Sequence, residues 1–297
     1  MRHLLDITDF SADELVNVLD LAERPDLPPV LAGLGVALIF EKPSNRTRQS
    51  MEMAVVQLGG HPIYTRGEEV GFDVRETVED ITRVMAGYHA MLAARVFDHG
   101  VVERMAAVSA VPIVNMLSDH SHPLQALADT LTMRQTHGPL TGQTVAYVGD
   151  YNNVSRSLAE ACVMLGANVA LACPLGYDAS DAEIERLNLL GNGRVDQVHR
   201  PLEAVSGAIA VHTDTWTSMG QEAEKDDRKQ AFEGYTVTDQ MMAKAAPNAG
   251  FYHCLPAYRG YEVAAEVIDG PQSKVFQQAH NRMHAARGAL AFLMGVR

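Results

Sequence analysis

The sequence predicts a two-domain α/β protein in which each domain holds a parallel β-sheet flanked by helices. Three observations support this fold: short apolar runs recur along 297 residues, helix-like stretches separate them, and a polar segment rich in Gly and Pro, "RQTHGPLTGQ" (134–143), divides the chain. Strands that are apolar on both faces and alternate with helices are typical of parallel sheets. The length also favours two domains, at roughly 100–200 residues each.

The first helix is predicted in "DFSADELVNVLDLAER" (9–24). Ser11 can cap this helix, and Glu14 three residues later completes a capping box. Apolar side chains recur at helical spacing after Glu14 and give the helix one apolar face. Prolines at positions 25, 28 and 29 end it.

Strands and helices then alternate to the C-terminus. The predicted strands are "GVALIF" (35–40), "HAMLAARV" (89–96), "VPIVNML" (111–117), "TVAYVGD" (144–150), "ANVALACP" (167–174), "AIAVHTD" (208–214) and "GFYHCLP" (250–256). Each run is too short and too continuously apolar for an amphipathic surface helix. The predicted helices are 46–58, 76–87, 122–136, 153–166, 180–190 and 238–246, with a last helix at the C-terminus. Loops at the carboxyl ends of such strands carry ligand sites.

Composition limits the kinds of partner. The formal net charge of −13 disfavours nucleic-acid binding, which needs a basic surface, but it permits a small anion in a local basic pocket. Three cysteines at wide spacings predict neither a disulfide framework nor a metal site. The N-terminus lacks the apolar core of a signal peptide, and no run approaches the ~18 apolar residues of a membrane span. We therefore expect a soluble cytoplasmic protein.

The segment "EKPSNRTRQS" (41–50) gathers cations at the predicted start of a helix. Pro43 excludes helix before it and Ser44 is a natural N-cap, so Arg46 falls in the first turn. A cation in that turn opposes the helix dipole by ~0.3–1 kcal/mol. A bound anion would remove this conflict, and phosphate suits free N–H groups, hydroxyls and a guanidinium together. The alternative is a solvated basic turn without a ligand.

The segment "SDHSHPLQALADTLTMRQ" (118–135) places two polar side chains on one face of a helix start. Pro123 suits the first helical position, and His122 and Gln125 are three residues apart. A His donor beside an amide that both donates and accepts suits a carbonyl next to an NH₂ group. A capping His with an exposed Gln is an equally good interpretation of these residues alone.

Two later strands end in residues that carry chemistry. In "DTWTSMG" (214–220), Asp214 follows a strand, where a carboxylate suits a substrate ammonium, and the loop that ends in Gly suits a lid. An aspartate that caps a helix is the alternative. In "HCLPAYRG" (253–260), Cys254 also ends a strand. It is either a buried core thiol or a group that orients a neighbouring carboxylate or amine.

A nucleotide site is not predicted. The segment "VGDYNNVSRS" (148–157) follows a strand and opens a helix, but it lacks the glycines of G-x-G-x-x-G, and no G-x-x-x-x-G-K-[ST] pattern occurs in the chain. A phosphate site without either loop indicates a small phosphorylated substrate.

Together, four motifs resemble those of the aspartate/ornithine carbamoyltransferase family, and they are most similar to its ornithine branch. They are Ser-x-Arg-Thr-Arg, His-Pro-x-Gln, Asp-x-x-x-Ser-Met-Gly and His-Cys-Leu-Pro, in this order along essentially the whole chain. In the family, the first two mark carbamoyl phosphate binding. The last two, with the pair Asn152–Asn153, mark ornithine as the second substrate, and "RGYEV" after Cys-Leu-Pro is of the ornithine type.

The resemblance implies an architecture and a reaction. Residues 1–135 with the C-terminal helix 275–297, which packs back on them, would form a carbamoyl phosphate-binding domain, and residues 136–274 an ornithine-binding domain. The δ-amine of L-ornithine would attack carbamoyl phosphate and give L-citrulline and phosphate, a step of arginine biosynthesis, without a metal or another cofactor. A homotrimer, or a multiple of trimers, with active sites at subunit interfaces is implied as well.

The resemblance also assigns roles to residues. The implied carbamoyl phosphate set is Ser44, Asn45, Arg46, Thr47, Arg95, His122, Gln125, Cys254, Leu255 and Arg282. The implied ornithine set is Asn153, Asp214, Ser218 and Met219. Charge on the carbonyl oxygen would be stabilised where Arg95, His122 and Arg282 converge. Asp214 with Cys254 is the candidate for taking the proton of the amine, whose pKa resembles the ~10.4 of lysine; the leaving phosphate is the alternative.

Three positions depart from the family pattern. Asn45 stands where Thr is usual, and its side chain still suits a helix start. Glu69, in "RGEEVGFDVRET" (66–77), lies near the place of a Gln that reaches a neighbouring subunit's phosphate site, where a carboxylate would repel phosphate. Tyr258 stands where His is frequent. The 66–77 segment is therefore where we expect ligand contacts to differ from the family pattern.

Three other functions compete with this one. They are a carbamoyltransferase for another amine (putrescine or an N-acylated ornithine), a catalytically silent paralogue, and a nicotinamide oxidoreductase. The intact Arg46, Arg95, His122 and Cys254 argue against a silent paralogue. The missing glycines argue against the oxidoreductase.

Overall fold

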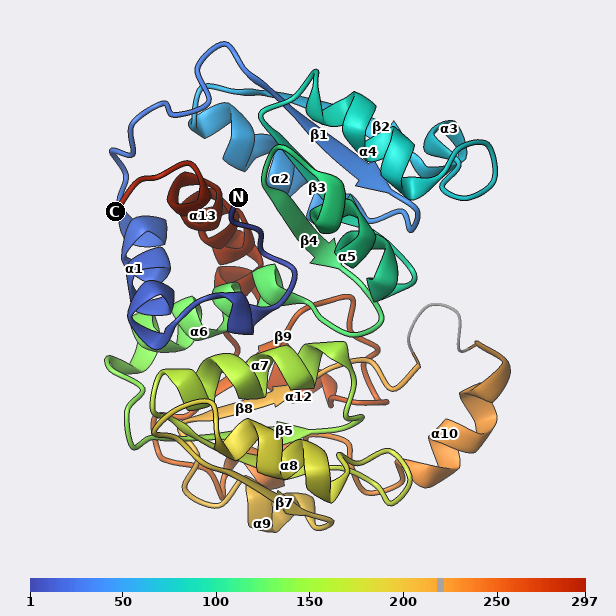
Figure 1. Ribbon diagram of the computed structural model, residues 1–297. Coiled ribbons are helices and arrows are strands. Elements are labelled where there is room, and N and C mark those ends of the chain that lie inside the picture. The colour runs from blue at the N-terminus through green and yellow to red at the C-terminus, as the bar shows by residue number, and fades with distance from the viewer. Residues whose placement is uncertain (218–221) are drawn as a thin grey trace. The chain divides into compact units, whose positions relative to one another are not determined.

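The computed structural model describes residues 1–217 and 222–297, and this part of the chain divides into two compact units (Figure 1). Unit 1 comprises Met1–Ala128 and His280–Arg297, and unit 2 comprises Asp129–Ala279. The chain passes from unit 1 into unit 2 within α6 (Pro123–His137) and returns within α13 (Val275–Leu293).

Unit 1 is built on a parallel sheet in the order β2-β1-β3-β4. Its strands are β1 (Gly35–Phe40), β2 (His61–Arg66), β3 (Met91–Arg95) and β4 (Ile113–Leu117). Its other helices are η1 (Ile7–Asp9), α1 (Ala12–Glu23), α2 (Asn45–Gln57), α3 (Gly67–Val70), α4 (Val78–Ala86) and α5 (His99–Val108). Apolar side chains of α4 and α5 cover one face of β1 and β3. The run "GVALIF" forms a strand, as predicted; β2 and β3 pair with it on its two sides, and five of its six residues are buried.

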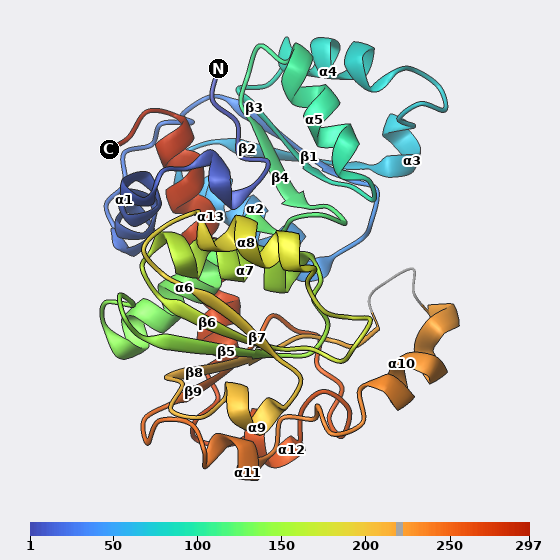
Figure 2. The ribbon, with the colours of Figure 1, turned by 60° about the horizontal axis from the view of Figure 1, so that its bottom comes forward.

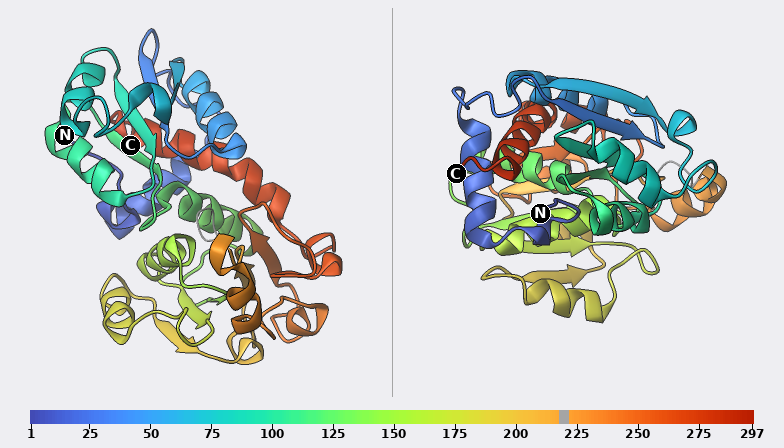
Figure 3. Two further views of the ribbon diagram at one scale, coloured as in Figure 1. Left: turned by 90° about the vertical axis from the view of Figure 1, so that its right-hand side faces the viewer. Right: turned by 45° about the horizontal axis from the view of Figure 1, so that its top comes forward.

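The C-terminal helix α13 packs against α1, as predicted (Figure 3). A Cβ atom added at Gly288 would lie 2.7 Å from the carbonyl oxygen of Val18, so the two helices approach closely at that glycine. The rings of Phe10 and Phe292 meet edge to face, with centroids 5.4 Å apart. The last turns of the chain therefore complete the core of unit 1.

Unit 2 is built on a second parallel sheet, in the order β7-β6-β5-β8-β9. Its strands are β5 (Thr144–Val148), β6 (Asn168–Ala172), β7 (Val195–Val198), β8 (Ala210–Thr213) and β9 (Gly250–His253). One face packs on α7 (Asn153–Met164) and α8 (Asp181–Asn188). The other packs on α9 (Pro201–Ala204), α11 (Asp239–Met242) and α12 (Ala265–Ile268). In the chain, η2 (Glu222–Glu224) and α10 (Lys225–Ala231) come between β8 and β9, and α10 lies to the side of these three helices (Figure 2). The prediction of two parallel-sheet domains flanked by helices is confirmed.

The sequence does not predict β2 and β7. Both are edge strands, at the ends of their sheets. β2 reads "HPIYTR" and β7 reads "VDQV", so neither forms an apolar run. An edge strand can carry polar residues because only one of its sides is paired within the sheet.

Within residues 1–217 and 222–297, no helix combines the length with the apolar character that a membrane span requires.

Candidate active site

In unit 1, four residues separate the end of β1 from the start of α2, and Ser44 caps this helix as predicted. The N–H of Thr47 donates to Ser44 Oγ at 3.4 Å. Asn45 and Arg46 lie exposed in the first turn. The free N–H groups of a first turn and an exposed guanidinium make this helix start suitable for an anion.

Arg95 ends β3 beside this helix start. The pairing of β3 with β4 shifts register between Ala94 and Arg95, and such a bulge re-aims the side chain that follows it. The Arg95 side chain is buried, and its Nη1 donates to Thr47 Oγ1 at 3.2 Å. The guanidinium is thereby held against the first turn of α2.

His122, Gln125 and Arg282 are buried in the same unit. His122 immediately precedes α6, Gln125 lies in the first turn of α6, and Arg282 lies on α13. Burial places the pKa of His122 well below its ordinary value, and the charges of Arg282 and Arg95 lower it further. The imidazole is therefore neutral near pH 7 and lies close to both guanidinium groups.

Lys42 adds another cation near Arg95. Burial lowers the pKa of Lys42, and the charge of Arg95 lowers it further. Its ammonium lies 4.3 Å from the centroid of the Phe97 ring. Cations gathered in a partly buried place repel one another, so a bound anion would stabilise this arrangement.

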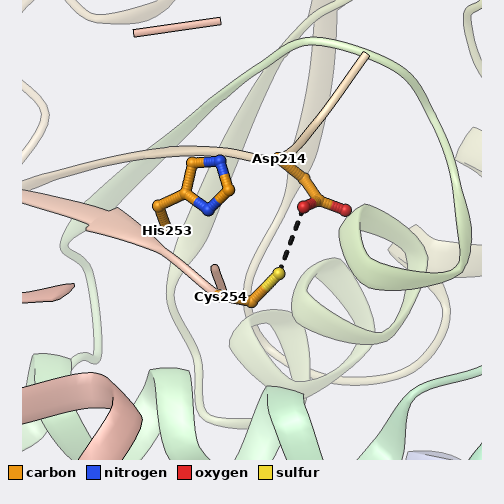
Figure 4. Close-up of side chains that lie close together, drawn as sticks. All are labelled: Asp214, His253 and Cys254. Atoms are coloured by element: carbon orange, nitrogen blue, oxygen red, sulfur yellow. Dashed lines mark hydrogen bonds between the residues drawn. The ribbon is translucent and has the colours of Figure 1, made fainter. Parts of the chain in front are cut away.

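In unit 2, Asp214 follows β8 and is held at both carboxylate oxygens. The Cys254 thiol donates to Oδ1 at 3.1 Å, as Figure 4 shows, and Asn152 Nδ2 donates to Oδ2 at 3.2 Å. Asp214 is buried and Cys254 is half-buried. The structure thus brings together Asp214 and Cys254, the residues that directly follow β8 and β9. The side chain of Asn152 hydrogen-bonds to the same Asp214 carboxylate.

His253 and Leu255 flank Cys254. His253 is buried; its Nδ1 accepts the N–H of Leu255 at 2.9 Å, and its Nε2 faces Glu262 Oε1 at 3.3 Å. Leu255 has a φ of 60°, which is unusual for a residue with a side chain and needs support from its surroundings. Ligand atoms of Asp214, His253 and Cys254 lie within 4.8 Å of one another, a spacing that suits a metal ion. Such an ion would have to displace the protein partners of the His253 ring.

The remaining predicted residues are placed as follows. Asn153 is the first residue of α7 and is half-buried. Ser218 and Met219 lie outside the described residues. Glu69 lies exposed on α3, and Tyr258 is exposed in unit 2.

Arg104 of α5 holds the 66–77 segment of unit 1 in place. Its guanidinium donates to both carboxylate oxygens of Asp73, at 2.6 and 3.0 Å, and to Glu79 Oε1 at 2.7 Å. Asp73 adopts a φ of 55°, a conformation that aspartate tolerates better than most residues. The segment therefore has a defined conformation within one chain.

Two protein-family models match this chain. Residues 2–135 match "Aspartate/ornithine carbamoyltransferase, carbamoyl-P binding domain", and residues 141–293 match "Aspartate/ornithine carbamoyltransferase, Asp/Orn binding domain". The chain belongs to the aspartate/ornithine carbamoyltransferase family. The prediction of this family from the four motifs is confirmed.

Relatives within the carbamoyltransferase family match nearly the whole chain. Ornithine carbamoyltransferases of Parafrankia sp. and Thermus thermophilus are each 44% identical to it, and each match covers 99% of this chain, with 96% and 97% of the relative. The solved structure of ornithine carbamoyltransferase from Pyrococcus furiosus superposes with a TM-score of 0.94 at 41% identity, covering 100% of this chain and 98% of that one. An N-acetyl-L-ornithine transcarbamylase is less similar, at 27% identity and a TM-score of 0.88.

Asn152 and Lys42 are site residues whose contacts the sequence does not predict. Asn152 caps α7 by accepting the N–H groups of Val154 and Ser155, and its amide nitrogen then reaches Asp214. An Asn that follows a strand and starts a predicted helix can indicate a site residue. Its side-chain oxygen caps the helix, and its NH₂ group can then donate to a neighbouring carboxylate. Lys42 is one of the cations of the 41–50 segment. That it lies near Arg95 could not be predicted, because this depends on the pairing of β1 with β3.

Proposed function

We propose that this protein transfers the carbamoyl group of carbamoyl phosphate to the δ-amine of L-ornithine, giving L-citrulline and phosphate. The observation that carries the proposal is the contact of Cys254 with Asp214 in a chain that is 44% identical to named ornithine carbamoyltransferases along nearly its whole length. The cations of unit 1 supply a second argument, because carbamoyl phosphate is an anion.

We assign carbamoyl phosphate to unit 1. The start of α2 would hold the phosphate through Ser44, Asn45, Arg46 and Thr47, with Arg95 bridging phosphate and carbonyl oxygen. His122 and Arg282 would donate to the carbonyl oxygen, and Gln125 would accept from the carbamoyl nitrogen. A lowered pKa keeps His122 neutral, so its ring offers one N–H donor without adding a further buried charge.

The chemistry follows from these donors. As the amine attacks the carbamoyl carbon, negative charge grows on the carbonyl oxygen, and donors already in place stabilise that charge. The bond to the phosphate oxygen then breaks, and phosphate leaves with its electron pair. Holding two substrates in reactive positions supplies a large share of the rate.

We assign ornithine to unit 2, where Asn153, Asp214, Ser218 and Met219 would bind its amino-acid end. Cys254 and Leu255 would lie beside the reacting amine. An alkylamine has a pKa near ~10.4, so the amine must lose a proton before it attacks. Asp214, held by Asn152 and Cys254, is our candidate to receive that proton, and the leaving phosphate is the second candidate.

The assembly and the location are also proposals. We expect domains of 1–135 with 275–297 and of 136–274, and a homotrimer whose subunits share active sites, as the family resemblance implies. Sedimentation should then give three times the chain mass of 32.3 kDa, or a multiple of that value if trimers associate further. The cysteines Cys162, Cys173 and Cys254 are thiols in this structure, which is compatible with the reducing cytoplasm.

The test is a product assay with four amines. Purified protein with carbamoyl phosphate is offered L-ornithine, putrescine, N-acetylornithine or aspartate, and the carbamoylated product is identified by mass spectrometry. We expect citrulline from ornithine at a rate far above the other products. A faster reaction with another amine, or no product from any of them, would contradict the proposal.

A further inference from the structure

We propose that Gln278 is a positioning residue that sets the geometry of Cys254 and Asp214. Gln278 lies on α13 within unit 2, and its side chain is fully buried. The inference rests on the proposed function, because the geometry that Gln278 holds is the one assigned to ornithine.

The partners of Gln278 determine how its amide is oriented. Its Oε1 accepts the backbone N–H of His253 at 2.9 Å, and its Nε2 donates to Asp129 Oδ1 at 2.6 Å. A reversed amide would set a donor against the N–H and an acceptor against the carboxylate. The observed orientation is therefore the one that satisfies both ends.

His212 of β8 completes the arrangement. Its Nε2 lies 3.3 Å from Asp129 Oδ2 and 3.2 Å from Gln278 Nε2. The His212 ring thus links the Asp129 carboxylate and the Gln278 amide, since its Nε2 lies within hydrogen-bond distance of both. We call Asp129, His212, His253 and Gln278 the Gln278 cluster; all four are 0% exposed, so a lost partner inside it cannot be replaced by bulk water.

The Gln278 cluster completes the edge of the sheet. β9 is an edge strand, so its outward backbone groups need partners from beyond the sheet. The N–H of Phe251 donates to the carbonyl of Gln272 at 2.9 Å, and the carbonyl of Phe251 accepts from Lys274 at 2.8 Å. The next outward N–H, two residues along β9, belongs to His253, and Gln278 accepts it.

The Gln278 amide thus contacts both β8 and β9, the two strands that are followed by Asp214 and Cys254. Asp214 lies two residues beyond His212, and Cys254 directly follows His253 (Figure 4). Gln278 ties the end of β9 to β8 and to α6, so it sets the separation on which the 3.1 Å contact of Cys254 with Asp214 depends.

The first experiment compares Gln278→Leu with Gln277→Leu, its exposed neighbour on α13. For Gln278→Leu we expect kcat to fall and the KM for ornithine to rise, each by about tenfold, because a small displacement of positioned groups lowers the rate strongly. The Kd of carbamoyl phosphate should change less, because only Cys254 and Leu255 of its implied set lie in unit 2. Gln277→Leu should match the parent protein in all three values.

A readout without turnover accompanies the kinetics. Cys162 and Cys173 are buried and Cys254 is half-buried, so iodoacetamide should modify Cys254 first. In Gln278→Leu the end of β9 is less constrained, and we expect alkylation of Cys254 to be several-fold faster than in the parent and in Gln277→Leu. Peptide mapping identifies the modified thiol.

A double variant that exchanges the amide of Gln278 and the carboxylate of Asp129 tests the hydrogen bond between them. Gln278→Glu keeps an acceptor for His253 but sets a carboxylate against Asp129, so it should be as impaired as Gln278→Leu or more. Adding Asp129→Asn restores a donor and acceptor pair with its direction reversed, and we expect the double variant to recover most of the ornithine KM and the slow alkylation.

The outcomes separate the two proposals. Folded Gln278→Leu protein with parental ornithine KM and parental alkylation rate overturns the positioning role, as does an exchange variant no better than Gln278→Glu. If the parent protein makes no citrulline, the proposed function fails, while the alkylation rates still decide whether Gln278 holds Cys254. Circular dichroism establishes that each variant is folded.

Discussion

Asp214 shows how residues far apart in the chain can hold one carboxylate. Its two oxygens accept from Asn152 and Cys254, which lie 62 and 40 positions away in the sequence. Two donors on separate elements fix the direction of the carboxylate without covering it fully. A substrate ammonium would therefore meet a carboxylate that is already oriented.

Arg46 offers a test of the phosphate site with little effect on stability. The side chain is exposed, so Arg46→Ala should change the free energy of unfolding by no more than about 0.5 kcal/mol. Carbamoyl phosphate binding should nevertheless be lost in isothermal titration calorimetry. Arg48→Ala is the matched control, because Arg48 lies on the same helix but bonds to Glu52 and lies over the ring of Tyr64. Equal affinities in parent and Arg46→Ala would refute the assignment.

His122 predicts a pH dependence of stability. Its pKa is about 6.5 in the unfolded chain and well below that value in the folded protein. Between the two pKa values the unfolded state binds more protons, so stability is full above pH 6.5 and is lost as the pH falls. Urea unfolding at pH 7.5 and 5.5 should show a smaller loss for His122→Asn than for the parent, by up to ~1.4 kcal/mol per pH unit. Equal losses would show that His122 is not buried as a neutral ring.

At the scale of residues, the sequence predicts which groups end the strands but not how they bond. Asp214 and Cys254 follow apolar runs and were candidates for that reason. Asn152 belongs to the pair that marks the ornithine branch, but its bond to Asp214 was not predicted, because the capping of α7 already accounts for an Asn at that position. Gln278 was hidden for a different reason: a glutamine in a helix is usually exposed, and its burial depends on three segments that sequence spacing does not relate.

At the scale of elements, the interior strands were predicted, and so were two of the four edge strands, β4 and β9. The outer side of β4 bonds to the backbone of Leu4, and most of its residues are buried. β1, β3, β5 and β8 each pair with a strand on both sides, and their side chains are buried on both faces of the sheet. Their sequences are therefore continuous apolar runs. β9 is also an edge strand, yet it was predicted, because residues 272–274 and Gln278 cover its outer side and its residues are buried. β2 and β7 are less buried, and their sequences retain polar residues.

The packing of α13 on α1 predicts that Gly288 cannot be enlarged. Alanine is the better helix former by ~1 kcal/mol, but its Cβ would lie 2.7 Å from backbone atoms of Val18 and Ala22. Backbone cannot yield as a flexible side chain can, so Gly288→Ala should lower the free energy of unfolding by about 1–3 kcal/mol. Urea titration measures this. A more stable variant would show that the helices lie further apart.

At the scale of the whole chain, unit 1 is discontinuous and depends on the last residues. Phe292 packs on Phe10, and Arg287 donates to the carbonyl oxygens of Ala22 and Arg24. A chain that ends at position 279 should therefore lose hydrogen-exchange protection in α1 and β1, whereas β5, β6 and β8 keep theirs. Retained protection in α1 would mean that residues 280–297 are dispensable for the fold of unit 1.

The single tryptophan gives this protein an optical probe of its own. Trp216 is buried against Phe232 in unit 2, with ring centroids 5.4 Å apart, and its carbonyl accepts from Arg228 at 3.0 Å. It lies two residues before Ser218, which we assign to ornithine. Indole emission therefore reports on unit 2 alone, and a spectral change on adding ornithine can be attributed to that unit without a label.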